Sequence, residues 1–349
     1  MRLGHAGECH VINSATYFLS LETSCDETSA AVFRDDLRIL ANVIASQTDL
    51  HARFGGVVPE VAARAHLQRL LPVIDEALRR ANIKLEQIGC IAVLNRPGLI
   101  GALLVGVSAA KILAMALGVP LVAGNHIEAH IYACRLAAGR DIFPCVGLVV
   151  SGGHTSLFHC QTPLEFSLLG ATIDDAAGEA FDKVASILGL GFPGGPAVER
   201  EANTGNPTAH RFPRSFFHEE RLDFSFSGLK TAVLYTLHGT GVARGPVPPP
   251  GQGRADLAAS FQQAVVDVLV QKARQALRRT GSNRLAVGGG VAANKTLRNA
   301  LEIMVREEKA ELFIPSLELC TDNAAMAAIA VEKWKLGQWA AADLDAVAS

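Results

Sequence analysis

The stretch Gly147–Leu157 constrains the fold most, because an apolar run is interrupted by two glycines and small hydroxyl residues before it continues. This pattern predicts two strands joined by a tight turn whose free backbone N–H groups can bind a phosphate-sized anion. The same design occurs near the N-terminus, where apolar residues 17–21 precede polar residues 22–29 and apolar residues 30–33. Two such hairpins predict that one phosphate group is bound between two hairpin turns.

A third glycine turn completes the pattern. The apolar run Leu285–Val287 enters Gly288–Gly290, and a helix is expected to follow near Asn294. The N-terminus of such a helix can face a nucleotide. One glycine turn is most often a plain turn, so the prediction depends on the order and spacing of all three. Together with alternating strands and helices, they predict an α/β protein with the actin-like ATPase (ASKHA) fold, in which two duplicated α/β domains surround a nucleotide cleft.

The length of 349 residues exceeds what one hydrophobic core normally serves, and a hydrophobic fraction of 49% is ample for two cores. We predict a first actin-like domain over residues 15–135, closed by a C-terminal helix over residues 321–340. The second domain is expected over residues 141–320, with a helical insertion over residues 170–280.

Hydrophobic periodicity places the elements of the first half. Residues 15–45 are expected to form a strand meander, Ile88–Val93 a strand and Ile100–Leu117 a helix. Pro59–Ala81 has the pattern of an amphipathic helix. Its core-facing side chains are expected to be Val61, Leu67, Leu70, Leu71 and Ile74.

In the second half, Gly170–Leu190 and Asp256–Arg279 are expected to be helical. Residues 191–222 are rich in Pro, Gly, Asn, His and Arg, which favours a surface segment near a cleft. The Pro- and Gly-rich residues 239–253 are expected to form a loop.

Charge and cysteine usage narrow the class of protein. The formal net charge is −2, so any polyanion must bind at a local basic patch. The seven cysteines contain no C-x-x-C pair, which indicates free thiols in a reducing compartment. Residues 97–125 carry one charge, but their glycines and prolines favour a buried helix and strand over a membrane span. Residues 1–14 lack an apolar core of signal-peptide length, so a cytoplasmic protein without membrane contact is expected.

His126 and His130 are the candidate metal ligands, because a spacing of four residues puts both imidazoles on one helix face. A third ligand is needed, and Asp322 at the start of the last predicted helix can supply it. The alternatives are a pair of hydrogen-bonded core histidines, and Asp322 or Thr321 as a helix N-cap. Two imidazoles and a carboxylate are ligands that suit Fe²⁺, Zn²⁺ or Mn²⁺. An ion with open coordination positions could polarise a substrate oxygen.

A zinc peptidase would need a glutamate directly after the first histidine, where it can act as base beside the metal-bound water. Here that neighbour is Ile127, and the glutamate is Glu128. The sequence therefore disfavours a peptidase.

Seven segments resemble the motifs of one family: Glu22–Thr28, His51–Glu60, His126–His130, Ser151–Thr155, Ile173–Lys183, Phe224–Thr231 and Cys320–Ala325. The family is the tRNA N6-adenosine threonylcarbamoyltransferases, once described as O-sialoglycoprotein endopeptidases. The resemblance extends over residues 16–336, and the form of the first motif is similar to the bacterial and mitochondrial branch.

The resemblance implies an enzyme that transfers an L-threonylcarbamoyl group from threonylcarbamoyl-AMP to N6 of the adenosine 3′ to the anticodon. The tRNAs would be those reading codons that begin with A, and AMP would be released. One metal ion per subunit is implied, with His126, His130 and Asp322 as ligands, and Fe²⁺ is the ion usually assigned, with zinc as the alternative. Because no general base is evident, catalysis is expected to depend on metal polarisation and substrate positioning.

The resemblance also implies substrate contacts. The backbone of Val149, Val150, Ser151, Gly152 and Gly153 would hold the phosphate and the threonylcarbamoyl part. The adenosine part would contact Asp182, Gly195, Glu199 and Asn294. The alternatives are a surface carboxylate for Asp182 and a simple turn at Gly194–Gly195. The candidate tRNA contacts are Lys230, Arg211 and Arg214, with Arg200 and Arg221 nearby, unless these cations are only solvated.

Bacterial members work with a fold-related paralogous subunit and a small ATPase, so both are expected partners. Four residues depart from the family pattern: Arg96 replaces a glycine, Glu199 an aspartate, Asn125 a histidine and Ala129 a glycine. Arg96 would be strained if its φ had to be positive. The rival readings are a metal-dependent endopeptidase, a non-catalytic scaffold, and a sugar or acetate kinase of the same fold.

Overall fold

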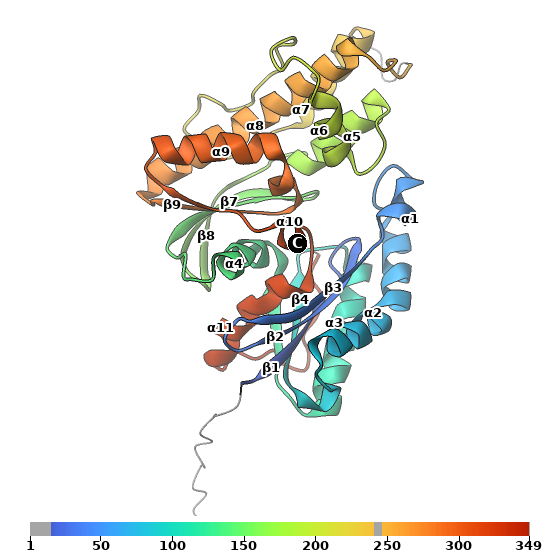
Figure 1. Ribbon diagram of the computed structural model, residues 1–349, viewed down its shortest axis with the longest axis vertical. Helices are drawn as coiled ribbons and strands as arrows, with labels where there is room; N and C mark the ends of the chain where they lie inside the picture. The colour runs from blue at the N-terminus through green and yellow to red at the C-terminus, as the bar shows by residue number, and fades with distance from the viewer. Residues whose placement is uncertain (1–14, 241–245, 349) are drawn as a thin grey trace, which may run out of the picture.

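Two five-stranded sheets form the framework of the molecule, with helices packed on both (Figure 1). The computed structural model describes residues 15–240 and 246–348. The expectations for residues 1–14, including Cys9, and for residues 241–245 of the predicted loop lie outside this range.

The first sheet has the order β3-β2-β1-β4-β5. β1 pairs antiparallel with β2, β2 pairs antiparallel with β3, and β4 and β5 continue the sheet in parallel. The predicted meander and the strand after it are therefore confirmed. The strands are β1 (Tyr17–Glu22), β2 (Glu27–Arg34), β3 (Ile39–Ser46), β4 (Ile88–Arg96) and β5 (Leu121–Asn125).

The second sheet repeats this topology. Its order, β8-β7-β6-β9-β10, again has three antiparallel strands followed by two parallel ones. The repeat confirms the duplicated α/β fold that the two glycine-broken hairpins predicted. The strands are β6 (Cys145–Val150), β7 (Thr155–Thr162), β8 (Glu165–Ala171), β9 (Arg284–Gly288) and β10 (Glu311–Phe313). The expected domain boundaries stay a prediction.

Helices cover both faces of the first sheet. α2 and α3 pack on the face that contains Leu19 and Leu21, and the C-terminal η3 packs on the opposite face against Phe18 and Phe33. The helical elements of this half are α1 (Thr48–Ala52), α2 (Pro59–Ala81), η1 (Leu85–Gln87), α3 (Ile100–Leu117), α4 (His126–Ala138), η3 (Ala324–Ile329) and α11 (Ala330–Lys335).

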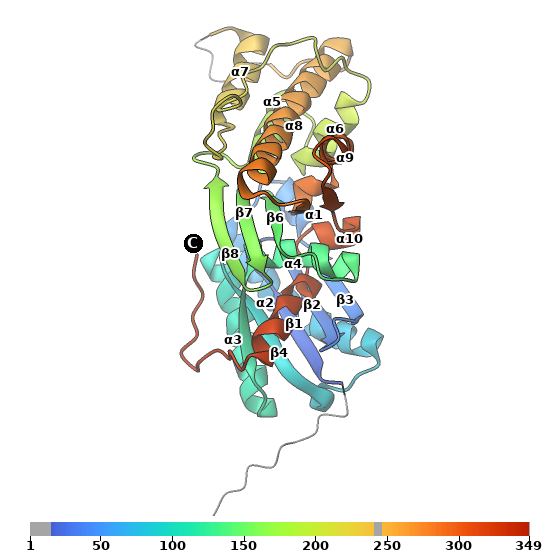
Figure 2. The same cartoon turned by 90° about the vertical axis from the view of Figure 1, so that its left-hand side faces the viewer.

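α4 lies between the two sheets (Figure 2). Ile131 on this helix packs against Val149 and Ala286 of the second sheet, whereas Ala129 packs with Leu94 of the first sheet. A helix held on both sides can present side chains at a fixed position between the two halves. The departure at Ala129 is accommodated, because its methyl group is part of this buried contact.

The prediction for the buried face of α2 is wrong at two positions. Leu70 and Ile74 are buried and Val61 is half-buried, but Leu67 and Leu71 are 69% and 68% exposed. These two leucines form a second apolar stripe, four residues apart, that faces away from the sheet.

The expectation of a buried helix after residue 97 is also only partly right. Leu104, Ile112 and Met115 of α3 are exposed, although the opposite face packs on the first sheet. Among the described residues α3 alone is long and apolar enough to cross a membrane, a test that a helix packed on a soluble core also passes.

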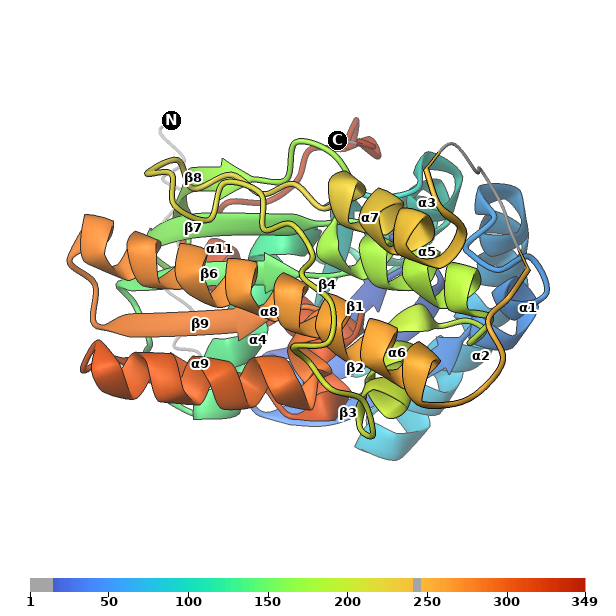
Figure 3. The same cartoon turned by 90° about the horizontal axis from the view of Figure 1, so that it is seen from above.

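The helices of the second half pack around the second sheet (Figure 3). Residues 170–176, expected to be helical, instead end β8 and form a turn before α5. The segment 191–222 contains α6 and, as expected, contributes to the lining of a cleft. The helical elements are α5 (Ala177–Leu188), α6 (Gly194–Ala202), α7 (Ser227–His238), α8 (Gln252–Thr280), η2 (Gly290–Ala293), α9 (Lys295–Glu307) and α10 (Leu317–Cys320).

A buried lysine on α8 holds the loop before α7. Nζ of Lys272 donates to the carbonyl oxygens of Phe216, Glu219 and Arg221 at 2.6, 2.9 and 2.7 Å. The Lys272 side chain is fully buried, so these carbonyl groups would lose a hydrogen-bond donor if it were removed.

Replacing Lys272 with methionine is expected to lower the free energy of unfolding by about 3 kcal/mol, because buried acceptors lose their donor. Urea unfolding of Lys272→Met beside the exposed control Lys335→Met measures this effect. Equal midpoints for the two variants would contradict it.

Candidate metal centre and nucleotide cleft

The N-terminus of α4 positions the two histidines. Asn125 caps the helix, since its side-chain oxygen accepts hydrogen bonds from the backbone N–H groups of Ile127 and Glu128 at 2.8 and 3.3 Å. His126 is the first residue of the helix and His130 follows one turn later. Asn125, which departs from the family pattern, is therefore a good N-cap residue.

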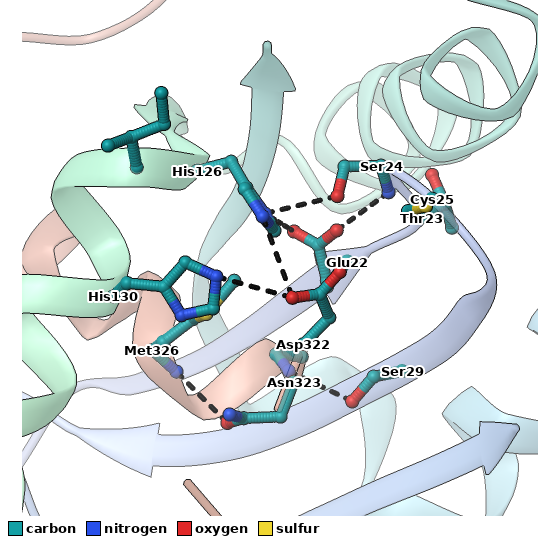
Figure 4. A network of polar contacts seen from close by, with 12 residues as sticks. Glu22, Thr23, Ser24, Cys25, Ser29, His126, His130, Asp322, Asn323 and Met326 are labelled. Carbon is teal, nitrogen blue, oxygen red and sulfur yellow. Dashed lines mark hydrogen bonds and ion pairs between the residues drawn. The ribbon is translucent and has the colours of Figure 1, made fainter. Parts of the chain in front are cut away.

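His126, His130 and Asp322 come together as the sequence predicted (Figure 4). Nε2 of His130 lies 3.2 Å from Oδ1 of Asp322, and Nε2 of His126 lies 3.6 Å from the same oxygen. One ligand atom from each residue lies within 4.8 Å of the others, and no second group of this kind occurs within residues 15–240 and 246–348. Both histidines are buried, at 4% and 0% exposure.

Asp322 is not a helix cap. Asn323 caps η3, because its side-chain oxygen accepts from the N–H of Met326 at 3.3 Å, and Thr321 ends α10. The alternative reading of Asp322 or Thr321 as an N-cap is wrong, and the Asp322 carboxylate is left facing the imidazoles.

The charges of the three groups are interdependent. Burial lowers the pKa of His126, but the carboxylates of Asp322 and Glu22 outweigh it and raise that pKa to about 9. Burial lowers the pKa of His130, and the neighbouring His126 lowers it further. Burial raises the pKa of Asp322, but the two imidazoles outweigh this and hold it below its usual range.

The donor set fits a divalent cation. Both ring nitrogens of His130 are buried without a hydrogen-bond partner, which is rare for polar atoms in a folded protein. A cation would satisfy the nitrogen that faces Asp322. Two imidazoles and a carboxylate match the preferences of Fe²⁺, Zn²⁺ and Mn²⁺.

A cleft of about 1300 Å³ opens beside this group and is lined from both halves of the chain. The candidate site residues that line it are His126, Ser151, Gly152, Gly153, Asp182, Gly195, Glu199, Lys230, Asn294 and Asp322. Sequence reasoning did not assign roles to Ser24, Cys25 and His154, which also line it although they lie inside the recognised motifs.

The turn between β6 and β7 forms one wall of the cleft. Ser151 N–H donates to the His154 carbonyl at 2.8 Å, and Gly152 and Gly153 are exposed at its tip. Val149 and Val150 do not line the cleft, because they lie within β6 and are fully buried. A wall of backbone N–H groups at the tip suits an anionic ligand.

Asp182 is half-buried and contacts the start of α6. Its Oδ1 accepts from Gly194 N–H at 2.7 Å, so it is more than a surface helix carboxylate. Burial raises the pKa of Asp182 to about 6, although this hydrogen bond opposes the shift. Gly195 follows as the second residue of α6, so Gly194–Gly195 is a helix start and not a simple turn.

Glu199 and Asn294 meet at the start of α9. Oε1 of Glu199 accepts from Lys295 N–H at 2.6 Å. The side-chain oxygen of Asn294 caps α9 through Leu297 N–H, and its Nδ2 donates to Gln262. Both side chains therefore have structural partners as well as a position on the cleft wall.

Of the three candidate tRNA contacts, only Lys230 lines the cleft. Among the described residues Lys230 forms no ion pair, whereas Arg214 pairs with Asp267 at 2.7 Å. Arg211 is exposed and lies away from the cleft lining. Of the three candidate residues, Lys230 is therefore the one whose position suits contact with a ligand in the cleft.

Arg96 is not strained, because its backbone lies outside the left-handed region. It ends β4, where it pairs with Asn125. The adjacent Asn95 binds the C-terminal segment through its carbonyl, which accepts from Val347 N–H at 2.9 Å. That segment reaches the cleft at Ala348, a contact that no sequence signal indicated.

The two duplicated sheets, with a cleft lined from both halves of the chain, define the actin-like ATPase fold. HypF from T. kodakarensis superposes with a TM-score of 0.62 at 13% identity, over 94% of this chain and 49% of that one. Component A of (R)-2-hydroxyglutaryl-CoA dehydratase from Acidaminococcus fermentans gives a TM-score of 0.53 at 16% identity, over 91% and 98%. At this identity the likeness shows the fold.

The sequence profile of the tRNA N6-adenosine threonylcarbamoyltransferases matches residues 38–329. Relatives of that name are 53% identical in Rhodopirellula baltica, over 94% of this chain and 95% of the relative, and 50% identical in Geobacillus thermodenitrificans, over 91% and 92%. The chain belongs to the tRNA N6-adenosine threonylcarbamoyltransferase family.

Proposed function

We propose that this chain transfers the L-threonylcarbamoyl group from threonylcarbamoyl-AMP to N6 of the adenosine 3′ to the anticodon, in tRNAs reading codons that begin with A. The observation that carries the proposal is the His126–His130–Asp322 group at the edge of a cleft lined from both halves, in a chain of this family. In the reaction the N6–carbonyl bond forms, the bond from that carbonyl carbon to the phosphate oxygen breaks, AMP leaves, and N6 loses one proton to water.

Each part of the cleft has a proposed task. The N–H groups of Gly152 and Gly153 hold the phosphate and the threonylcarbamoyl part, and Asp182 and Glu199 accept hydrogen bonds from the ribose hydroxyls. Asn294 and Gly195 complete the adenosine wall. Fixing both reactants in this way lowers the entropic part of the barrier. Lys230 is the proposed tRNA phosphate contact, because it is the candidate cation that lies at the cleft.

The proposed cofactor is one Fe²⁺ per subunit, with zinc as the alternative, held by His126, His130 and Asp322. When bound, the ion supplies Lewis acidity at the open side of the group. The buried nitrogens of His130 that lack hydrogen-bond partners support this assignment.

The rival functions lack a supporting observation. Glu128 does not line the cleft, and the charges that act on its carboxyl group are those of Lys333 and Arg96, so it is not placed as a peptidase base. A scaffold would not need buried imidazoles around a carboxylate. A kinase of this fold would depend on an aspartate and Mg²⁺, not on imidazole ligands.

We propose a paralogous subunit of the same fold as a partner, with a small ATPase as a further partner on family membership alone. α2 and α3 pack side by side and expose Leu67, Leu71, Ile112 and Met115, which supports a protein contact there. The six described cysteines are free thiols, which supports a cytoplasmic location.

The direct test incubates the purified chain with Fe²⁺, threonylcarbamoyl-AMP and an unmodified tRNA, with and without candidate partner subunits. Threonylcarbamoyladenosine in the nuclease digest is the expected product. A tRNA with guanosine at the position 3′ to the anticodon is the control and should stay unmodified. Product absent under every condition, or cleavage of a protein substrate instead, would overturn the proposal.

Adenosine affinity is expected to fall as the pH drops through about 6. Only ionised Asp182 is a full acceptor for the ribose, and its pKa is about 6, so binding at pH 5 should be about tenfold weaker than at pH 7. Adenosine is the probe because it carries no phosphate that titrates in this range. Calorimetry of the wild type beside Asp182→Asn measures it, and the variant should bind weakly at every pH.

The raised pKa of Asp182 affects the stability of the fold in the opposite direction, because it favours the folded protein at low pH. Because the folded-state pKa lies above 3.8, the stability due to this group is present below pH 3.8 and is lost as the pH rises through about 6.

A wild type whose adenosine affinity does not change with pH would contradict the assigned role of Asp182.

A further inference from the structure

Glu22 carries a buried carboxylate with one unsatisfied oxygen. It is the last residue of β1, and its side chain is fully buried. Oε1 accepts from the N–H of Ser24 at 2.6 Å, but Oε2 has no hydrogen-bond partner. Burying a carboxylate oxygen without a partner is costly, so this atom needs an explanation.

Oε2 of Glu22 and Oδ1 of Asp322 both face His126, each near a different nitrogen of the ring (Figure 4). Oε2 of Glu22 lies 3.6 Å from Nδ1 of that imidazole, and the hydroxyl of Ser24 lies 3.0 Å from the same nitrogen. The other ring nitrogen, Nε2, lies 3.6 Å from Oδ1 of Asp322. The two nitrogens of one ring therefore face two different carboxylates.

The neighbours of Nδ1 decide which nitrogen of His126 can bind a metal. The Ser24 hydroxyl can donate or accept, so alone it permits a ring proton on either nitrogen. If Ser24 donated to Nδ1, the proton of the neutral ring would sit on Nε2 and block the lone pair that faces Asp322. A carboxylate only accepts, so Glu22 favours the proton on Nδ1 and leaves Nε2 free.

We infer that Glu22 is a positioning residue that selects the tautomer of His126 whose Nε2 lone pair points at the proposed metal position. The inference rests on the proposed metal centre. Glu22 itself is not one of the ligands, because the clustered ligand atoms come from His126, His130 and Asp322. It acts through the ring and not through contact with the ion.

The test is the affinity for Zn²⁺ alone, measured by competition with a chromogenic chelator on the full chain. Glu22→Gln keeps the side-chain volume but offers an amide that can donate to Nδ1 and favour the wrong tautomer. We expect it to weaken Zn²⁺ binding about 10- to 100-fold, the usual effect of removing such a partner. Glu128→Gln is the matched control, since Glu128 is on the same helix and does not line the cleft; it should bind Zn²⁺ like the wild type.

Nitrogen NMR of the wild type with Zn²⁺ gives a readout that does not need the variant to fold. The expected spectrum has a proton on Nδ1 of His126 and the metal on Nε2. Equal affinity of Glu22→Gln and wild type, or a metal-bound Nδ1, overturns the role of Glu22 alone. A wild type that binds no Zn²⁺ or Fe²⁺ overturns the metal centre, and the role of Glu22 with it.

Discussion

Asp322→Asn is expected to lower the rate of threonylcarbamoyl transfer by on the order of 10²- to 10³-fold, the loss typical of removing one preorganised electrostatic group. The substitution removes the one carboxylate among the three proposed ligands, and leaves two buried imidazoles facing a neutral amide. Initial rates with threonylcarbamoyl-AMP and tRNA measure the loss of activity. We also expect the variant to bind less metal, so that metal analysis of the purified protein finds an iron content well below one ion per chain.

The matched control is Asp343→Asn, the same change at an exposed carboxylate near the C-terminus. It should retain the rate and the metal of the wild type. Thermal unfolding of both variants separates lost chemistry from lost fold. An Asp322→Asn protein that keeps both its rate and its metal would show that this aspartate is not a ligand.

The strands and the histidine pair could be predicted from the sequence because their signals are local. Glycines interrupt apolar runs at the two hairpins, and a spacing of four residues puts His126 and His130 on one helix face. Asp322 is 192 positions beyond His130, and no periodicity connects them. At the sequence level Asp322 is a candidate third ligand because of its place at the start of a predicted helix and because of the family resemblance; packing of η3 on the first sheet explains how it reaches the site.

The errors have a physical cause as well. Leu67 and Leu71 repeat at helical spacing, as core residues do, but α2 has apolar side chains on more than one face and periodicity does not say which face meets the sheet. Glu22 lies in a recognised motif, yet its role depends on a ring more than 100 residues away. Contacts of this kind follow from tertiary packing, which local pattern does not encode.

The site depends on how the two halves are held together. The imidazoles come from α4 between the sheets, Asp322 precedes η3 on the first sheet, and the glycine turn belongs to the second sheet. A small displacement of one part therefore changes the distance between the proposed metal and the anion-binding turn. Gly178 is the position where such a displacement can be introduced.

Gly178→Ala is expected to lower kcat/KM for threonylcarbamoyl-AMP about 100-fold, the effect of a misplacement of about 1 Å. Gly178 is the second residue of α5 and lies against the turn, and its N–H donates to the carbonyl of Ser151 at 3.2 Å. A Cβ there would lie 2.4 Å from that carbonyl oxygen and 2.8 Å from Cα of Gly152. Both contacts are backbone atoms, so the turn or the helix must move.

Gly253→Ala is the control, because Gly253 lies on α8 with open space around its Cα. It should keep wild-type kinetics. The rate of transfer at saturating tRNA and the melting temperature are measured for both variants. If Gly178→Ala melts earlier but keeps its kcat/KM, α5 has absorbed the strain and the turn between β6 and β7 has kept its position, which would contradict the expected displacement of the turn.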